Sequence, residues 1–122
     1  IPVTAWSSNS HGSANSTEWL QLDMGSSYRV QDLRLVPRAG YCFPAAFAIT
    51  YSADGVTWYP VPGQSYTSFA NPASVGTTPN PVQLFQFSTP VTARYFKITA
   101  TQLNADQFGN YYFQLADVLI DQ

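Results

Sequence analysis

The sequence predicts an all-β fold, an antiparallel β-sandwich, and two observations support this class. Apolar and polar residues alternate with a period of two in several short runs, which is the pattern of strands with one buried face. The nine prolines and the many β-branched and aromatic residues leave no helical stripe of apolar positions. Short strands separated by regular turn signals then favour a sandwich or a barrel.

The chain is expected to begin with a loop, because residues 1–17 are rich in Ser, Asn and Gly. The first strand is expected at 18–24, where Leu20, Leu22 and Met24 alternate with polar residues. One face of this strand should therefore be buried. Further strands are expected at 29–36, 46–52, 57–61, 83–88, 94–101 and 111–120.

A tight hairpin is expected between the strands at 46–52 and 57–61. The pair Asp54-Gly55 supplies the positive φ angles that short hairpin turns require. The two flanking strands should therefore be antiparallel neighbours. Residues 62–81 lack strand periodicity, and their prolines favour an ordered surface loop.

One domain covering residues 1–122 is expected, since this length can bury one core but not two. Charged residues make up only 10% of the chain, against roughly a quarter in an average soluble domain, whereas aromatic residues reach 16%. Burial of aromatic and aliphatic side chains must therefore provide the stability.

The charge of the chain argues against two classes of partner. A formal charge of −2 with five Lys and Arg does not provide the clustered basic surface that nucleic acid requires. The same scarcity weakens attraction to an anionic membrane. No apolar run of about 18 residues is present, and the first residues lack the regions of a signal peptide. We expect a mature, excised or partial chain.

Cys42 is the only cysteine, so it cannot form a disulfide within the chain. The sequence therefore neither requires nor excludes an oxidising compartment. We expect Cys42 to be a buried packing residue, with a reactive or intermolecular thiol as the alternative.

Short motifs that follow one another along almost the whole chain point to a family. They are Trp6-Ser7-Ser8, the loop from His11 to Glu18, Trp19-Leu20-Gln21-Leu22-Asp23-Met24-Gly25, Leu35-Val36-Pro37-Arg38, the segment from Phe47 to Trp58, Ala93-Arg94-Tyr95-Phe96-Lys97-Ile98, and Phe113-Gln114-Leu115-Ala116-Asp117-Val118. Their order resembles that of the coagulation-factor type C, or discoidin, superfamily, and most closely the bacterial family 32 carbohydrate-binding modules. The resemblance implies a jelly-roll sandwich like that of galactose-binding domains.

The sequence departs from this family pattern in two places. Family members usually have an opening strand and an Asp-Gly loop before the position of Trp6, and that loop helps to bind a structural calcium ion. The present sequence starts after these elements, so the calcium site is not carried over intact. Asp117 stands where the family commonly has a glutamate that helps to hold the ion. Its shorter carboxylate still suits a hard cation, so Asp117 is the candidate ligand for calcium.

A sugar site needs a few convergent polar groups and an aromatic face, because hydroxyls require directional hydrogen bonds and the C–H face of a pyranose packs on a ring. The resemblance places the ligand loops at one end of the sandwich and assigns His11 and Arg38 to the site. A ring nitrogen of His11 can bond a hydroxyl, and the planar fork of Arg38 can donate two bonds. Alternatively, His11 is a solvent-exposed loop residue, and Arg38 makes a structural bond.

The remaining candidates each have a structural alternative. Glu18 either accepts bonds from sugar hydroxyls or pairs with Arg38. Tyr41 and Phe43 either stack on the sugar or close the core. Tyr111 and Tyr112 must face opposite ways on a strand, and we expect Tyr111 to reach the site. The weaker polar candidate is Asn110.

Four further residues match the family scaffold and not its binding loops. They are Trp19, Trp58, Arg94 and Tyr95, and we expect structural roles for them.

Catalysis is not expected. One histidine and one cysteine are too few for a catalytic zinc site, and no signature pairs Cys42 with His11. Glycosidases place two carboxyl groups roughly 5 to 9.5 Å apart. On one extended strand, Glu18 and Asp23 would lie about 17 Å apart and face opposite sides.

The resemblance implies noncatalytic binding of a glycan that ends in galactose, an N-acetylhexosamine or a related sugar. The module would tether a larger glycan-active or surface protein, secreted or at the surface of a bacterial cell. Two alternatives remain open: a discoidin-like adhesion module that binds protein or phospholipid, and a structural domain of a larger enzyme. Membrane binding is disfavoured because the basic residues are few.

Overall fold

The computed structural model describes residues 6–38, 41–72 and 82–122. These residues form strands and no helix, so none of them belongs to a helix that is long and apolar enough to cross a membrane. The strands are β1 (Trp6–Ser7), β2 (Glu18–Pro37), β3 (Ala46–Ser52), β4 (Tyr59–Tyr66), β5 (Gln83–Gln102), β6 (Asn104–Ala105), β7 (Tyr111–Tyr112) and β8 (Gln114–Asp121). A six-stranded antiparallel sheet has the order β1-β8-β2-β5-β3-β4, and β6 pairs with β7.

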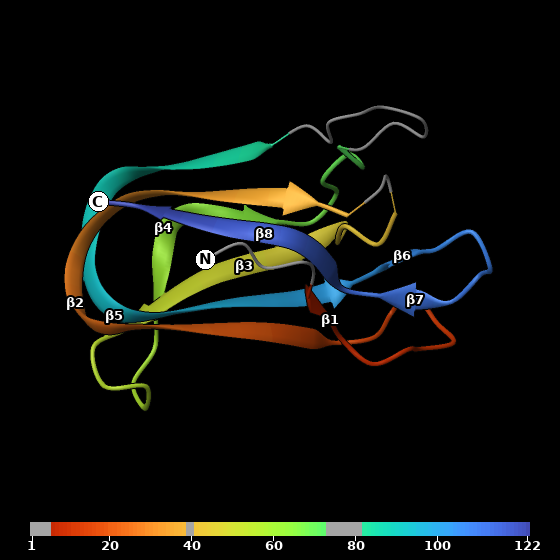
Figure 1. The fold of residues 1–122 in the computed structure, drawn as a ribbon, viewed down its shortest axis with the longest axis horizontal. Helices are drawn as coiled ribbons and strands as arrows, with labels where there is room; N and C mark the ends of the chain where they lie inside the picture. Colours follow the sequence, from red (N-terminus) through yellow and green to blue (C-terminus); the bar gives the residue numbers. More distant parts are fainter. Residues whose placement is uncertain (1–5, 39–40, 73–81) are drawn as a thin grey trace.

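The large sheet is folded into two layers, because β2 and β5 are long and both bend at the same end of the molecule (Figure 1). In one layer, residues 18–23 of β2 pair with residues 95–100 of β5, which also pairs with β3. In the other layer, residues 28–35 of β2 pair with residues 83–93 of β5, and β8 flanks β2 on its other side. The expected antiparallel β-sandwich is confirmed.

The bend in β2 follows from its local sequence. The register with β5 shifts between Asp23 and Tyr28, so the residues between them leave the ladder. Gly25 has a φ of 82°, a value that costs glycine little because it has no Cβ, and its N–H donates to Asp23 Oδ1 at 2.8 Å. The sequence around Gly25, which predicts a turn, therefore bends one strand from the first layer into the second and does not join two separate strands.

Two expectations about strand boundaries are wrong for this reason. The strands expected at 18–24 and 29–36 are one continuous strand, β2, and those expected at 83–88 and 94–101 are one strand, β5. Each passes from one layer to the other through its bend. A period-two pattern marks the paired halves but does not reveal that they are continuous.

Other boundaries also differ from the prediction. β4 runs to Tyr66, into the segment expected to be a loop, and its Pro60 and Pro62 are tolerated because β4 is an edge strand. The short strand β1 lies in the expected N-terminal loop, and β7 and β8 are separated at Phe113. Residues 73–81 of the expected loop lie outside the described residues.

The predicted pairing of β3 with β4 is confirmed, but the connection is not a tight turn, because six residues, 53–58, separate the two strands. The two strands are antiparallel neighbours, and Gly55 in the turn has a φ of 79°. Asp54 Oδ1 accepts hydrogen bonds from the backbone N–H groups of Val56 and Thr57 and from the hydroxyl of Ser52. These bonds lower the pKa of the Asp54 carboxyl, with the Thr57 bond contributing most.

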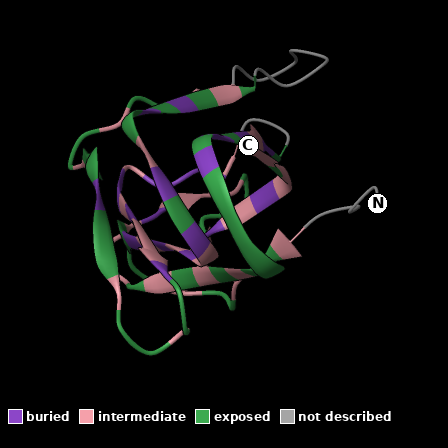
Figure 2. Cartoon of the chain, turned by 90° about the vertical axis from the view of Figure 1, so that its left-hand side faces the viewer, coloured by how far each residue is buried: buried purple, intermediate pink, exposed green. Residues whose placement is uncertain are grey.

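The buried residues lie between the layers (Figure 2), and the core that they form is rich in aromatic rings. Phe47 is 2% exposed and contacts the rings of Phe69 and Phe85 at centroid distances of 5.4 and 5.5 Å. Leu20, Leu22 and Met24 pack against this core, as their alternation predicts. Burying a side chain of this size contributes about 1.5–3 kcal/mol, so the aromatic core is a large part of the stability.

Candidate functional site

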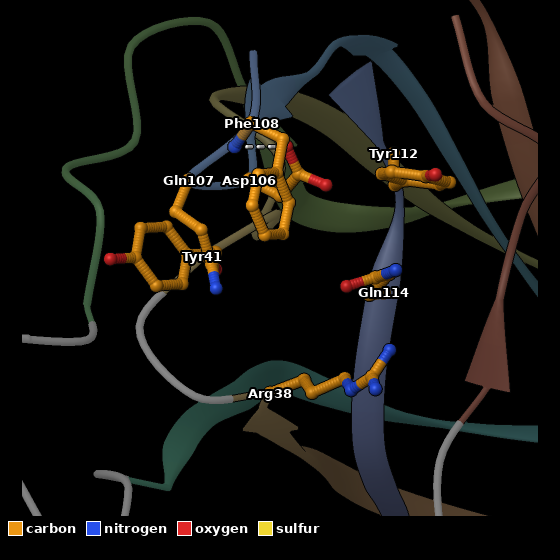
Figure 3. A pocket seen from close by; sticks show the side chains of 7 residues that line it. All are labelled: Arg38, Tyr41, Asp106, Gln107, Phe108, Tyr112 and Gln114. Atoms are coloured by element: carbon orange, nitrogen blue, oxygen red, sulfur yellow. Dashed lines mark hydrogen bonds between the residues drawn. The ribbon is translucent and has the colours of Figure 1, made fainter. Parts of the chain in front are cut away.

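A cleft of about 420 Å³ opens at the end of the sandwich where the loop after β2 meets the β6–β7 hairpin. Its volume lies within the range of about 300–1,000 Å³ that is usual for small-molecule sites. The residues that line it are Arg38, Tyr41, Asp106, Gln107, Phe108, Tyr112 and Gln114 (Figure 3).

The β6–β7 hairpin presents an aromatic ring to solvent beside the cleft. Asp106 Oδ1 accepts hydrogen bonds from the backbone N–H groups of Phe108 and Asn110, at 2.9 and 3.0 Å. Gly109 completes the turn with a φ of 81°. The carboxylate of Asp106 thereby caps the turn. Phe108 lies at the tip of the turn and is 78% exposed.

On the other side of the cleft, Cys42 anchors the loop that follows β2 to the start of β8. This residue has a φ of 64°, is completely buried, and its carbonyl accepts a hydrogen bond from the N–H of Gln114 at 3.0 Å. Burial, followed by the charge of Asp106, raises the pKa of the Cys42 thiol to about 11. The expectation of a buried packing cysteine is confirmed, and its neighbour Tyr41 is placed at the cleft.

The polar groups of the cleft are complementary. Figure 3 shows Arg38 and Asp106 on opposite sides, with Gln114 between them. The amide nitrogen of Gln114 donates to Ser7 Oγ at 3.0 Å, which fixes the side chain and leaves its oxygen as an acceptor. Donors, acceptors and the ring of Tyr112 therefore surround one space, an arrangement suited to a molecule with several hydroxyl groups.

Two of the predicted ligand residues, Arg38 and Tyr41, line this cleft. Phe43 does not, and its prediction as a stacking residue is wrong. Its side chain is completely buried and packs at centroid distances of 5.8 Å from Phe47 and 5.6 Å from Phe69. The alternative reading, in which the ring before Pro44 closes the core, is the one the structure supports.

The expected orientation of the two tyrosines in β7 is also wrong for this cleft. Tyr112 lines it, whereas Tyr111 packs against the hydrophobic core. Asn110 is exposed on the hairpin turn and is not part of the lining. Alternation along a strand correctly separates the two rings, but it does not tell which face holds the cleft.

His11 and Glu18 form a pair of their own. His11 Nε2 lies 2.6 Å from Glu18 Oε2, with 30% and 20% of the two side chains exposed. The backbone of His11 exchanges two hydrogen bonds of 2.9 Å with Tyr111. Neither side chain lines the cleft, so the structure does not bring His11 together with Arg38. The partner of Glu18 is His11, and not Arg38 as one reading expected.

Sequence reasoning did not select five residues of the cleft as ligand candidates, although it weighed one of them, Tyr112, against Tyr111. One signal was present, because Asp106 precedes a glycine-containing turn and such an aspartate commonly caps the turn with its side chain. Nothing in the sequence alone indicates that Gln114 points to the cleft, since its neighbours on β8 are core residues. The five residues are Asp106, Gln107, Phe108, Tyr112 and Gln114.

The calcium expectation rests on Asp117, whose Oδ1 accepts the N–H of Val118 at 2.8 Å. Asp117 lies beside an apolar groove of about 220 Å³ lined mostly by residues such as Trp6 and Leu20. Calcium needs six to eight oxygen ligands. Within the described ranges, no three His, Cys, Asp or Glu side chains come together to hold a metal ion. Backbone carbonyl oxygens are also calcium ligands, so the calcium expectation for Asp117 stays a prediction.

The four expected scaffold residues lie on the outer side of the layer that contains the first half of β2. Arg94 forms two hydrogen bonds to Asp23, at 2.8 and 3.0 Å, and its guanidinium lies over Tyr95. This ion pair lowers the pKa of Asp23 and links β5 to β2 beside their bends. Trp19, by contrast, is 54% exposed and belongs to no core.

Comparison with known families gives one family match. The model of the F5/8 type C domain matches residues 2–114. Lactadherin from Bos taurus is 30% identical in an alignment over 99 residues that covers 77% of this chain and 22% of lactadherin. The chain therefore spans less than a quarter of that relative.

Solved structures show the same architecture. The family 32 carbohydrate-binding module of NanJ from C. perfringens, solved with galactose, has a TM-score of 0.67 and 20% identity, covering 95% of this chain and 74% of that one. Module CBM32-1 from a family 31 glycoside hydrolase of Clostridium perfringens has a TM-score of 0.68 and 23% identity, covering 97% and 76%. At these identities the likeness establishes a shared fold.

Proposed function

We propose that this chain, which belongs to the F5/8 type C domain family, is a noncatalytic module that binds a sugar in the cleft between Arg38 and Asp106. The observation that carries the proposal is this pair of opposite charges on the two sides of one cleft, with the exposed ring of Phe108 and the half-buried ring of Tyr112 beside them. Arg38 donates to hydroxyl oxygens, and Asp106 accepts from hydroxyl groups.

The aromatic residues of the cleft would bind the apolar face of the sugar. Phe108 is available at the tip of its hairpin, and Tyr112 lies on the neighbouring strand. The C–H groups of a pyranose pack on such rings, while its hydroxyl groups reach the polar residues. Because one cation and one anion line the cleft, we infer a neutral sugar and not a charged one.

The ligand that we propose is a terminal galactose, an N-acetylhexosamine or a related sugar. Its support is the likeness to the NanJ module, which was solved with galactose. We further propose that the module is tethered to a glycan-active or surface protein that is secreted or exposed on a cell. Tethering would raise the local concentration of the larger protein near its glycan.

The test is a titration of the purified domain with galactose, N-acetylgalactosamine and N-acetylglucosamine, after a glycan array has ranked them. Arg38→Ala should weaken binding at least about tenfold, since a charge-assisted hydrogen bond is worth about 1.5–3 kcal/mol. The matched control is Arg29→Ala, which removes another exposed arginine that does not line the cleft. Unchanged binding by Arg38→Ala, or equal loss in the control, would contradict the proposal.

A second candidate function is adhesion to a phospholipid surface, and one observation favours it. Phe108 is a large apolar side chain that is 78% exposed at a loop tip, close to Arg38. Such a ring could enter a bilayer, as interfacial aromatic residues do. Sedimentation with phosphatidylserine vesicles distinguishes the candidates, because binding to vesicles that galactose does not compete with would favour the lipid.

A further inference from the structure

A second group of aromatic and cationic side chains lies on the outer face of the layer formed by β3, the second half of β5 and the first half of β2. Trp19 comes from β2, Tyr95 and Lys97 from β5, and Trp58 from the segment before β4. We call these four residues the outer aromatic face. None of them lines the cleft at Arg38, and Trp19 is 54% exposed.

Lys97 is the centre of the outer aromatic face. Its Nζ lies 4.3 Å from the ring centroid of Trp58 and 5.3 Å from that of Trp19. Trp58 also packs edge-on against Tyr95, with the centroids 6.4 Å apart. Each cation–π contact at an exposed site contributes about 0.5–1 kcal/mol, so these contacts hold the ammonium group beside the two indoles.

The charge of Lys97 has no carboxylate partner among the described residues. Each ion pair there joins other side chains, and Asp23 on the same face has both oxygens bound by Arg94. The rings reduce the cost of holding this charge, but they leave its N–H donors available. The outer aromatic face therefore presents one positive charge without a carboxylate partner, between the exposed ring of Trp19 and the half-buried ring of Trp58.

We propose that the outer aromatic face is a second glycan site, for an acidic polysaccharide that contains uronic acid residues. The indoles pack on the C–H faces of sugar rings, and Lys97 pairs with a sugar carboxylate. Gln21 and Thr99, the cross-strand neighbours of Lys97 and Trp19, provide hydrogen-bonding groups for hydroxyls beside the rings.

The composition of the face distinguishes this ligand from other polyanions. Single-stranded nucleic acid also stacks on aromatic rings, but it carries a phosphate at every residue and needs a continuous basic groove. Here Lys97 is the one cation without a carboxylate partner among the described residues of the face, and the whole chain has a formal charge of −2. A uronic acid polymer needs only one of its carboxylates at Lys97, because the carboxylates of the neighbouring sugars can stay in solvent, and it therefore matches this surface better.

The experiment compares two polymers with the same backbone. Polygalacturonate and its fully methyl-esterified form are titrated into the domain, and polygalacturonate is expected to bind the more tightly, with an affinity that falls as salt rises. Lys97→Gln should weaken polygalacturonate binding at least tenfold. Arg29→Gln removes the same charge from an exposed position elsewhere and should change binding less than twofold.

Trp19→Ala provides a second variant whose core stays intact, since this ring is largely in solvent, and it should also weaken binding at least tenfold. Equal affinity for the two polymers, or equal losses in Lys97→Gln and Arg29→Gln, would overturn the proposal. Tighter binding of a deoxythymidine oligomer than of polygalacturonate would also overturn it in favour of nucleic acid. Binding of neutral sugars that depends on Arg38 tests the cleft separately, so either site can fail alone.

Discussion

Asp32 of β2 and Asp121 of β8 are cross-strand partners, and Asp32 is 7% exposed whereas the side chain of Asp121 is 38% exposed. Within the described residues, Oδ1 of Asp32 and Oδ2 of Asp121 are buried without a hydrogen-bond partner. Two ionised carboxylates can only accept bonds, so a proton on Asp32 is needed for it to donate to Asp121. Arg34 Nε lies 3.1 Å from Asp121 and 4.0 Å from Asp32, as an ion pair and not a hydrogen bond.

This pair should make the protein less stable as the pH rises. Burial, and then the neighbouring carboxyl group of Asp121, raise the pKa of Asp32, whereas the charge of Arg34 opposes the shift. A raised pKa stabilises the fold while the group is protonated, and this contribution is lost as the pH rises through the folded-state pKa. Asp32→Asn, which stays neutral, should therefore have a higher urea midpoint than the parent at pH 7, with the difference vanishing near pH 3.

The control for this pH series is Asp54→Asn, which should show the opposite sign. The pKa of Asp54 is lowered by its backbone hydrogen bonds, so its contribution is present at neutral pH and is lost as the pH falls. Asp54→Asn should lower the midpoint at pH 7 and converge with the parent in acid. If the urea midpoints of both variants changed in the same way with pH, a raised pKa of Asp32 would be disproved.

Phe108→Ala should weaken sugar binding without weakening the fold. The ring is largely exposed, so the unfolding free energy should change by less than about 0.5 kcal/mol. The lost packing on the sugar should reduce affinity roughly threefold to tenfold in calorimetric titrations. Val56→Ala, at a position 80% exposed on the β3–β4 loop, is the control, and a similar loss of affinity there would contradict a specific role for Phe108.

Gly55→Ala should destabilise the protein by about 1–2 kcal/mol, because Gly55 has a φ of 79° that a residue with a Cβ adopts only with strain. An added Cβ would lie 3.4 Å from the ring of Tyr95, which is an ordinary contact, so the loss comes from the backbone. Gly12→Ala is the comparison, since its added Cβ would meet nothing within 4 Å. Chemical denaturation measures the free energy of unfolding of both variants, and equal values would rule out backbone strain as the cause.

Cys42 should react with a thiol reagent only when the protein unfolds. The thiol is completely buried, and a pKa of about 11 leaves about one thiolate in a thousand at pH 8. Labelling with a chromogenic disulfide at pH 8 should be negligible in buffer and complete in denaturant. Rapid labelling of the folded protein would show that the loop beneath Tyr41 opens readily.

The sequence predicts the class of the fold well, because period-two alternation directly reports which face of a strand is buried. Leu20 and Leu22 face the core, and the Asp54-Gly55 turn joins two antiparallel strands, as expected. The sequence did not predict that β2 is one continuous strand, since the residues around Gly25 have the same turn-like composition whether a chain reverses direction or bends between layers.

The candidate site was predicted less completely, because its residues depend on long-range geometry. Arg38 follows a strand end, and the structure places it at the cleft, as that position led us to expect. Phe43 and Tyr111 are aromatic residues near the right loops, yet both pack inward. Whether a loop ring faces solvent or core is decided by the left-handed backbone at Cys42 and by the register of β7, neither of which has a reliable local sequence signal.

The bends in β2 and β5 give the domain a mechanical property. Most sandwiches resist sliding of one layer over the other through side-chain packing and connecting loops. Here two strands run without interruption from one layer into the next, each with its partner hydrogen-bonded on both sides of the bend. A force applied to one layer is therefore transmitted to the other layer through the covalent backbone of β2 and β5. At the end with the bends, this connection prevents the two layers from sliding past each other.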